Sequence, residues 1–128
     1  MPKHPLKPTE AELNILNVLW QNGPSTVREV FEILQPGQAS GYTTVLKTMQ
    51  IMFDKGLVKR NDKSKAHIYR AANPQSATQS HLVNDLLVRA FDGSKSQLIM
   101  RALDNTTSAE DIAELRNLLD RLEAEQNA

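Results

Sequence analysis

The sequence predicts a mainly α-helical chain that carries one small β-hairpin. Apolar residues recur at the three-to-four-residue spacing of amphipathic helices over most of the 128 residues. The spacing changes to a strand-like alternation between residues 57 and 71. Hydrophobic residues make up 40% of the chain and charged residues 23%, as in an ordinary globular protein. This composition excludes a mostly disordered chain, a collagen and a long polar coiled coil.

The first two helices are predicted from cap signals that precede apolar stripes. Thr9-Glu10-Ala11-Glu12 has the pattern of a capping box, in which a threonine oxygen and a glutamate three residues later satisfy free backbone amides. The helix that it opens ends before Gly23 and Pro24. Ser25 or Thr26 then caps a second helix, whose apolar side chains follow at i, i+3, i+4 and i+7.

A third helix and a hairpin complete a first domain, which we assign to residues 6–72. The helix runs from a cap at Ser40 to about Lys55, where Gly56 provides a C-terminal stop. Residues 57–60 and 66–71 read as two short strands joined by a polar loop. The order helix, helix, helix, hairpin is that of a winged helix-turn-helix domain. We expect its core to include Leu16, Trp20, Val30, Phe31, Tyr42, Val45, Met49 and Phe53.

Three further helices are predicted in a second domain, residues 73–126. Asn73-Pro74 opens the first of them, and capping patterns at Ser94 and Thr107 open the other two. Their apolar stripes are too many for a monomer of this size to bury, so we expect a helical homodimer interface. The last stripe has the 3-4-3 spacing of a short coiled coil. The expected interface residues are Leu82, Leu86, Leu87, Phe91, Leu98, Ile99, Ile112, Leu115, Leu119 and Leu122.

The formal net charge of zero conceals a difference between the two halves. Residues 1–72 carry ten basic and six acidic residues, a balance of +4, and residues 73–128 carry five and nine, a balance of −4. Five of the basic residues lie within the twelve positions 59–70, in the predicted hairpin. A basic half joined to an acidic half suggests two tasks, one of them on a polyanion.

The sequence shows none of the residue patterns of an enzyme or a metal site. Cysteine is absent, which excludes disulfides, thiolate metal sites, Fe–S clusters and a cysteine nucleophile. His4, His67 and His81 lack the spacing of metal ligands on a helix. There is no glycine-rich phosphate loop and no nucleophile-elbow motif. We therefore predict a protein that is not an enzyme and that needs no metal or cofactor.

The third helix and the hairpin suit double-stranded DNA. The outer face of the helix carries short hydroxyl side chains and one lysine, which can reach base edges or phosphates from within a major groove. A serine-glycine pair lets the helix N-terminus approach a phosphate, and lysines near the hairpin tip add affinity that is independent of sequence. The residues expected to contact DNA are Ser40, Gly41, Thr43, Thr44, Lys47, Lys63 and Lys65. The alternative is a winged-helix module for protein partners, without DNA readout.

The chain resembles the BlaI/MecI penicillinase-repressor family over nearly its whole length. The likeness is carried by residues 9–20, by Tyr42-Thr43-Thr44-Val45-Leu46-Lys47-Thr48-Met49 with Asp54-Lys55-Gly56-Leu57-Val58, and by Ala66-His67-Ile68-Tyr69-Arg70. The resemblance implies a dimeric winged-helix repressor that binds palindromic operators. In this family a membrane-bound sensor metalloprotease often triggers inactivation by cleavage within the C-terminal domain, so such a protease is an expected partner.

Three features depart from the pattern of that family. Ile51 stands where the family commonly has arginine, and Arg101-Ala102 stands where penicillinase repressors carry an Asn-Phe cleavage bond. The cysteine cluster of the copper-responsive branch is absent, so copper sensing is not expected.

The N-terminus lacks the apolar core of a signal peptide, and no apolar run approaches the ~18 residues of a membrane span. We therefore expect a cytoplasmic protein.

Overall fold

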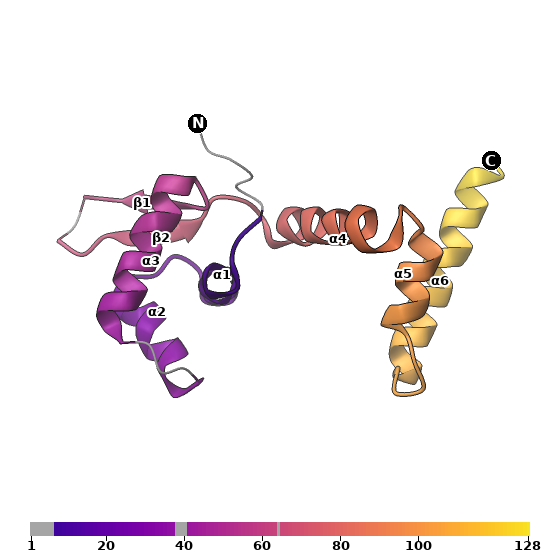
Figure 1. Ribbon diagram of the computed structural model, residues 1–128, viewed down its shortest axis with the longest axis horizontal. Coiled ribbons are helices and arrows are strands. Elements are labelled where there is room, and N and C mark those ends of the chain that lie inside the picture. Colours follow the sequence, from indigo (N-terminus) through magenta and orange to yellow (C-terminus); the bar gives the residue numbers. More distant parts are fainter. Residues whose placement is uncertain (1–6, 38–40, 64) are drawn as a thin grey trace. The chain divides into compact units, whose positions relative to one another are not determined.

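The computed structural model of the protein describes residues 7–37, 41–63 and 65–128 (Figure 1). Within them, three α-helices precede a two-stranded hairpin and three more helices follow it, as predicted. This confirms the mainly α-helical fold class with its N-terminal winged helix. The elements are α1 (Glu10–Asn22), α2 (Val27–Leu34), the 3₁₀ turn η1 (Gln35–Gly37), α3 (Tyr42–Lys55), β1 (Val58–Asn61), β2 (Ile68–Ala71), α4 (Gln75–Phe91), α5 (Lys95–Ala102) and α6 (Ala109–Gln126).

Reciprocal side-chain caps fix where the first two helices begin. The Thr9 hydroxyl oxygen accepts a hydrogen bond from the backbone N–H of Glu12, and the Glu12 carboxylate accepts one from the N–H of Thr9. Thr26 and Glu29 form the same box at the start of α2. Each box satisfies amides that have no partner inside the helix. The two helices therefore begin at positions that the local sequence dictates.

The contacts within the chain divide it into two compact units, residues 1–85 and 86–128. The division falls inside α4, later in the chain than the boundary after residue 72 that separates our two predicted domains. Within the first unit, two interactions hold the region after the hairpin to residues that precede α2. The Trp20 indole N–H donates to the Asn73 carbonyl at 3.0 Å, and the Lys7 ammonium lies 3.5 Å from the Asp85 carboxylate. The first half of α4 thus packs with the winged helix.

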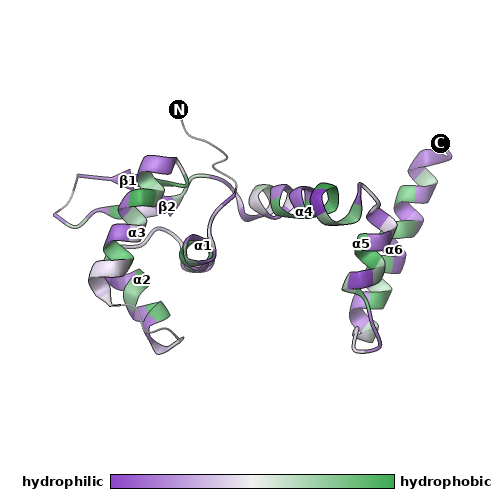
Figure 2. Cartoon of the chain, viewed as in Figure 1, coloured by the Kyte–Doolittle hydropathy of each residue, from purple (hydrophilic) through white to green (hydrophobic). Residues whose placement is uncertain are grey.

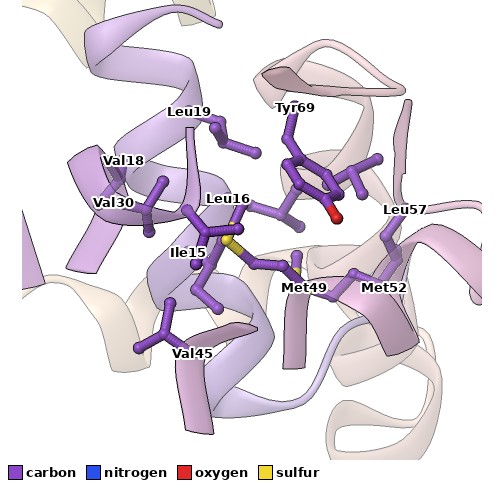
Figure 3. Close-up of a cluster of buried hydrophobic side chains, with 12 residues drawn as sticks. Ile15, Leu16, Val18, Leu19, Val30, Val45, Met49, Met52, Leu57 and Tyr69 are labelled. Carbon is purple, nitrogen blue, oxygen red and sulfur yellow. The ribbon is translucent and has the colours of Figure 1, made fainter. Parts of the chain in front are cut away.

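The hydrophobic core of the first unit lies between α1, α2, α3 and the hairpin (Figure 3). Burying a large apolar side chain contributes about 1.5–3 kcal/mol, so this cluster is the main source of the unit's stability. Its members come from every element of the winged helix, which locks α3 against the other two helices. The buried residues are Ile15, Leu16, Val18, Leu19, Val27, Val30, Val45, Met49, Met52, Leu57, Val58 and Tyr69.

The predicted core was wrong at Tyr42 and incomplete at Tyr69. Tyr42 is 36% exposed, because it is the first residue of α3 and its ring lies edge-on to Phe31, with ring centres 5.9 Å apart. Tyr69, by contrast, is 1% exposed and points among the core side chains in Figure 3. Its backbone also exchanges hydrogen bonds of 2.8 and 2.9 Å with Ser25. The linker between α1 and α2 is thereby fastened to the hairpin.

The second unit has almost no interior of its own. Among residues 86–128, all of which the structure describes, Leu87 is the one buried hydrophobic side chain. Hydrophobic and hydrophilic residues alternate along α5 and α6 (Figure 2). Nine large hydrophobic side chains of this unit are more than a third exposed, namely Leu86, Val88, Ile99, Met100, Leu103, Ile112, Leu118, Leu119 and Leu122.

Candidate nucleic-acid interface

The exposed face of α3 carries the side chains that we predicted to enter a major groove. Thr43, Thr44 and Lys47 are all exposed. Val45 and Met49, on the other side of the helix, are buried in the core. Because an α-helix has 3.6 residues per turn, burial of the side that carries Val45 and Met49 orients the three polar side chains toward solvent. The short threonine side chains allow close approach of a ligand, and the longer lysine adds one positive charge.

The N-terminus of α3 differs from our prediction. Its N-cap is Gly41, which has an extended backbone and makes no side-chain cap bond. Gly41 is exposed, and a Cβ atom built at this position would meet no atom within 4 Å. The predicted cap, Ser40, lies outside the described residues. The start of the helix is therefore accessible to a ligand on the side of Gly41 and Thr43.

The two faces of the hairpin carry different basic residues. The antiparallel register pairs Arg60 with Tyr69 and Lys59 with Arg70. Since side chains alternate between the faces of a strand, Arg60 shares the inner face with the buried Tyr69. Lys59 and Arg70 share the outer face and, with Arg60, Asp62 and Lys63, line an open groove of about 730 Å³. The outer face is therefore strongly basic.

Arg60 is engaged in interactions that hold the hairpin on α3. Its guanidinium lies 4.0 Å from the centre of the Phe53 ring, and its Nε donates to the Asp62 carboxylate at 2.8 Å. Hydrogen bonding with the Tyr69 side chain, and then with Asp62, raises the pKa of Arg60 above its ordinary value. Among the five basic residues of positions 59–70, Arg60 thus positions the hairpin rather than offering a free charge.

The loop between the strands, residues 62–67, presents the two lysines that we predicted to contact DNA. Lys63 and Lys65 are both exposed. The Asn61 side-chain oxygen accepts a hydrogen bond from the backbone N–H of Lys63 at 2.9 Å, which fixes the turn that leaves β1. His67 Nε2 lies 3.7 Å from the Asp62 carboxylate at the other end of the loop. The backbone at Lys63 is therefore held by the end of β1.

A partly buried ion pair between α1 and α3 fixes the C-terminal end of α3. Lys55 Nζ lies 2.7 Å from Oε2 of Glu12, whose side chain is 4% exposed. Burial raises the pKa of Glu12, but hydrogen bonds from Lys55 and from the Thr9 backbone outweigh it and hold the pKa below its ordinary value of 4.5. Sequence reasoning identified Glu12 as a cap alone, because 43 residues separate it from Lys55 and no local spacing reveals the pair.

Neither a metal centre nor a membrane-spanning helix occurs in the part of the chain that the structure describes. Those residues contain no group of three or more histidine, aspartate or glutamate side chains that could hold a metal ion. None of their helices combines the length and the apolar character that crossing a membrane requires.

The sequence model of the penicillinase repressor family matches residues 8–121. The chain belongs to this family. BlaI, a transcriptional regulator of Mycobacterium tuberculosis (strain H37Rv), is 29% identical over 116 residues, which cover 90% of this chain and 84% of BlaI. The methicillin resistance regulatory protein MecI of Staphylococcus aureus is 19% identical over 114 residues, 88% of this chain and 93% of MecI. The protein is thus a DNA-binding transcriptional regulator. Its family consists of transcriptional regulators, which are not enzymes.

The residues of this repressor that we predicted to form a dimer interface lie on α4, α5 and α6. Leu87 is already buried within the single chain, at 8% exposure. Leu82, Phe91, Leu98 and Leu115 are partly buried. The remaining members are more than a third exposed, namely Leu86, Ile99, Ile112, Leu119 and Leu122. Half of the predicted interface residues therefore present apolar surface that the single chain leaves in water.

Proposed function

We propose that the protein is a cytoplasmic homodimeric repressor that binds palindromic operators in double-stranded DNA. Residues 6–72 form its DNA-binding domain and residues 73–126 its dimerisation domain. The observation that supports DNA binding best is the exposed polar face of α3, which lies on the same unit as the exposed loop lysines. A winged helix uses these two elements to read the groove and to follow the backbone.

The contacts divide between readout and affinity. We assign Thr43, Thr44 and Lys47 to the major groove, where hydroxyls and an ammonium distinguish base edges. We assign the N-terminus of α3 at Gly41, and the preceding residue Ser40 as predicted from the sequence, to a phosphate contact. Lys63 and Lys65 neutralise further phosphates, and this contribution is independent of sequence and weakens with salt.

Dimerisation is supported by the exposed apolar surface of the second unit. An isolated unit of 43 residues with one buried hydrophobic side chain has too little core to be stable alone. A second copy would cover the exposed leucines and isoleucines of α4, α5 and α6. A two-fold dimer then presents two copies of α3 to two half-sites, which is why a palindromic operator follows from it.

Selection of bound duplexes from a random DNA pool tests this function. We expect recovery of an inverted repeat whose half-sites lie about one helical turn, or a multiple of it, apart. Sedimentation of the free protein should give the mass of two chains. Recovery of no motif, with weak binding that vanishes at moderate salt, would reject the readout and favour a winged-helix module for protein partners.

We further propose that repression is relieved by proteolysis within residues 73–126, with a membrane sensor protease as partner. Residues 103–106, between α5 and α6, are exposed and lie outside any helix, as a protease requires. Intact-mass measurement of the protein, recovered before and after an operator-controlled reporter is switched on, checks this. A full-length protein at full reporter activity would refute relief by proteolysis.

A further inference from the structure

A second groove of the first unit carries basic groups that the predicted DNA contacts only partly include. It lies between α2, α3 and the hairpin loop and has a volume of about 290 Å³. Arg28 lines it from α2, Gln50 from α3, and Lys65 and His67 from the loop. No aspartate or glutamate is among the described residues that line it. The groove therefore offers positive charge without a neutralising carboxylate in its wall.

Arg28 is held in this groove by an aromatic side chain. Its guanidinium carbon lies 4.9 Å from the centre of the Tyr42 ring. The Tyr42 ring in turn meets Phe31 edge-on, at an interplanar angle of 81°, and Phe31 packs against the core. Stacking on a ring restrains an arginine while its N–H groups stay free to donate in the guanidinium plane. The exposed Tyr42 ring therefore orients the Arg28 guanidinium, which a ring buried in the core could not do.

We propose that Arg28 and Lys65 bind one backbone phosphate of operator DNA, and that Tyr42 is a positioning residue for the Arg28 guanidinium. This inference rests on the proposed DNA-binding function and deepens it. A guanidinium donates two parallel hydrogen bonds to phosphate oxygens, and an ammonium across the groove adds a second charge. Arg28 lies on α2, the helix before the recognition helix, which in a helix-turn-helix crosses the DNA backbone instead of entering the groove. A phosphate, and not a base, is therefore its ligand.

The phosphate contact is tested by anisotropy titration of the full chain with the selected operator duplex. We expect Arg28→Ala to weaken binding by roughly tenfold or more, as for loss of a hydrogen bond to a charged group. The salt dependence, log K against log salt, should become shallower by about 0.9 per protomer. The ranking of operator sequence variants should stay the same. Arg101→Ala, which removes an exposed arginine from α5, is the matched control and should bind as the parent does.

Methylphosphonate substitutions placed symmetrically, one in each half-site of the operator, identify the ligand. Each pair removes the charge of the same phosphate in both half-sites, so the penalty of Arg28→Ala should disappear on the duplex in which the contacted phosphates are neutral. A penalty that persists on every such duplex would overturn the phosphate assignment. A changed ranking of operator variants would also overturn it, because that result indicates a base contact.

The positioning role of Tyr42 is tested by coupling. Tyr42→Leu should weaken binding when Arg28 is present and have no further effect in the Arg28→Ala background. Tyr42→Phe, which keeps the ring, should retain parent affinity. Thermal melting of each variant verifies that the domain is folded, and equal losses of affinity from Tyr42→Leu in both backgrounds would refute positioning.

If the parent protein selects an operator but Arg28→Ala binds it equally well, the phosphate contact is refuted and the proposed function stands. If the parent protein selects no operator, both the proposed function and the phosphate contact are refuted.

Discussion

Replacing Lys63 and Lys65 with alanine should make DNA binding less sensitive to salt. Both side chains are exposed on the hairpin loop, whereas Arg60 is held by Phe53 and Asp62. The variant therefore removes two exposed cations from each protomer while leaving the anchor of the hairpin in place. We expect no change in the preferred operator sequence, because contacts to phosphates carry no sequence information.

The size of the effect follows from counterion release. Each phosphate contact contributes about 0.9 to the slope of log K against log salt on B-form DNA, so two lysines on each of two protomers contribute about 3.6. Between about 50 and about 200 mM salt, this slope corresponds to a factor of ~150 in affinity. The parent should lose that much more affinity than the double variant over this range.

Anisotropy titrations of both proteins at several salt concentrations measure the slope. The matched control is Lys95→Ala with Arg101→Ala, which makes the same change in net charge at exposed positions of α5. Its slope should equal that of the parent. A double hairpin variant that also keeps the parent slope would show that the loop lies off the DNA. Equal loss of slope in the control would mean that net charge alone is responsible.

Three further predictions concern readout, stability and assembly. Lys47→Ala should weaken operator binding by about 1–3 kcal/mol if the ammonium reaches a base, and unchanged affinity in the same titration would remove that role. Glu12→Gln should lower the free energy of unfolding near neutral pH by about 1–3 kcal/mol in urea titrations, since Lys55 loses its charged partner. Because the folded pKa of Glu12 is lowered, its contribution is complete above about pH 4.5 and is lost as the pH falls through the folded value; the variant should lack this acid-dependent loss. A variant with the parent's pH dependence would contradict the assignment. Leu115→Asp with Leu119→Asp should give monomers in sedimentation, and an intact dimer would place the α6 stripe inside one chain.

Local sequence determined the helices and most of their ends. Thr9 and Glu12 start α1 because both partners of the capping box lie within one turn. Gly56 ends α3 because its backbone adopts φ of 85°, which glycine alone takes without strain. The outer face of α3 was also predictable, since helical periodicity separates Thr44 and Lys47 from the apolar stripe.

The choice between two local signals, however, depended on the tertiary structure. Ser25 and Thr26 are equally good caps in the sequence, yet Thr26 caps α2. The Ser25 backbone pairs with Tyr69, and its hydroxyl donates to the Gly23 carbonyl at 2.8 Å. At the start of α6, Ser108 is the cap and not the predicted Thr107, whose hydroxyl accepts from the Asp104 N–H instead. The cap was thus selected by a contact between distant segments of one domain at Ser25, and by a bond three residues away at Thr107.

The electrostatics of the site were likewise decided by packing between distant segments. The sequence determined that the hairpin is basic, but only the register of β1 and β2 turned Arg60 inward onto Phe53 and left Lys59 and Arg70 outside. The Glu12–Lys55 ion pair and the Arg28–Tyr42 stack each join two helices. Periodicity states which side of an element is apolar, whereas the meeting of two side chains depends on how the elements pack.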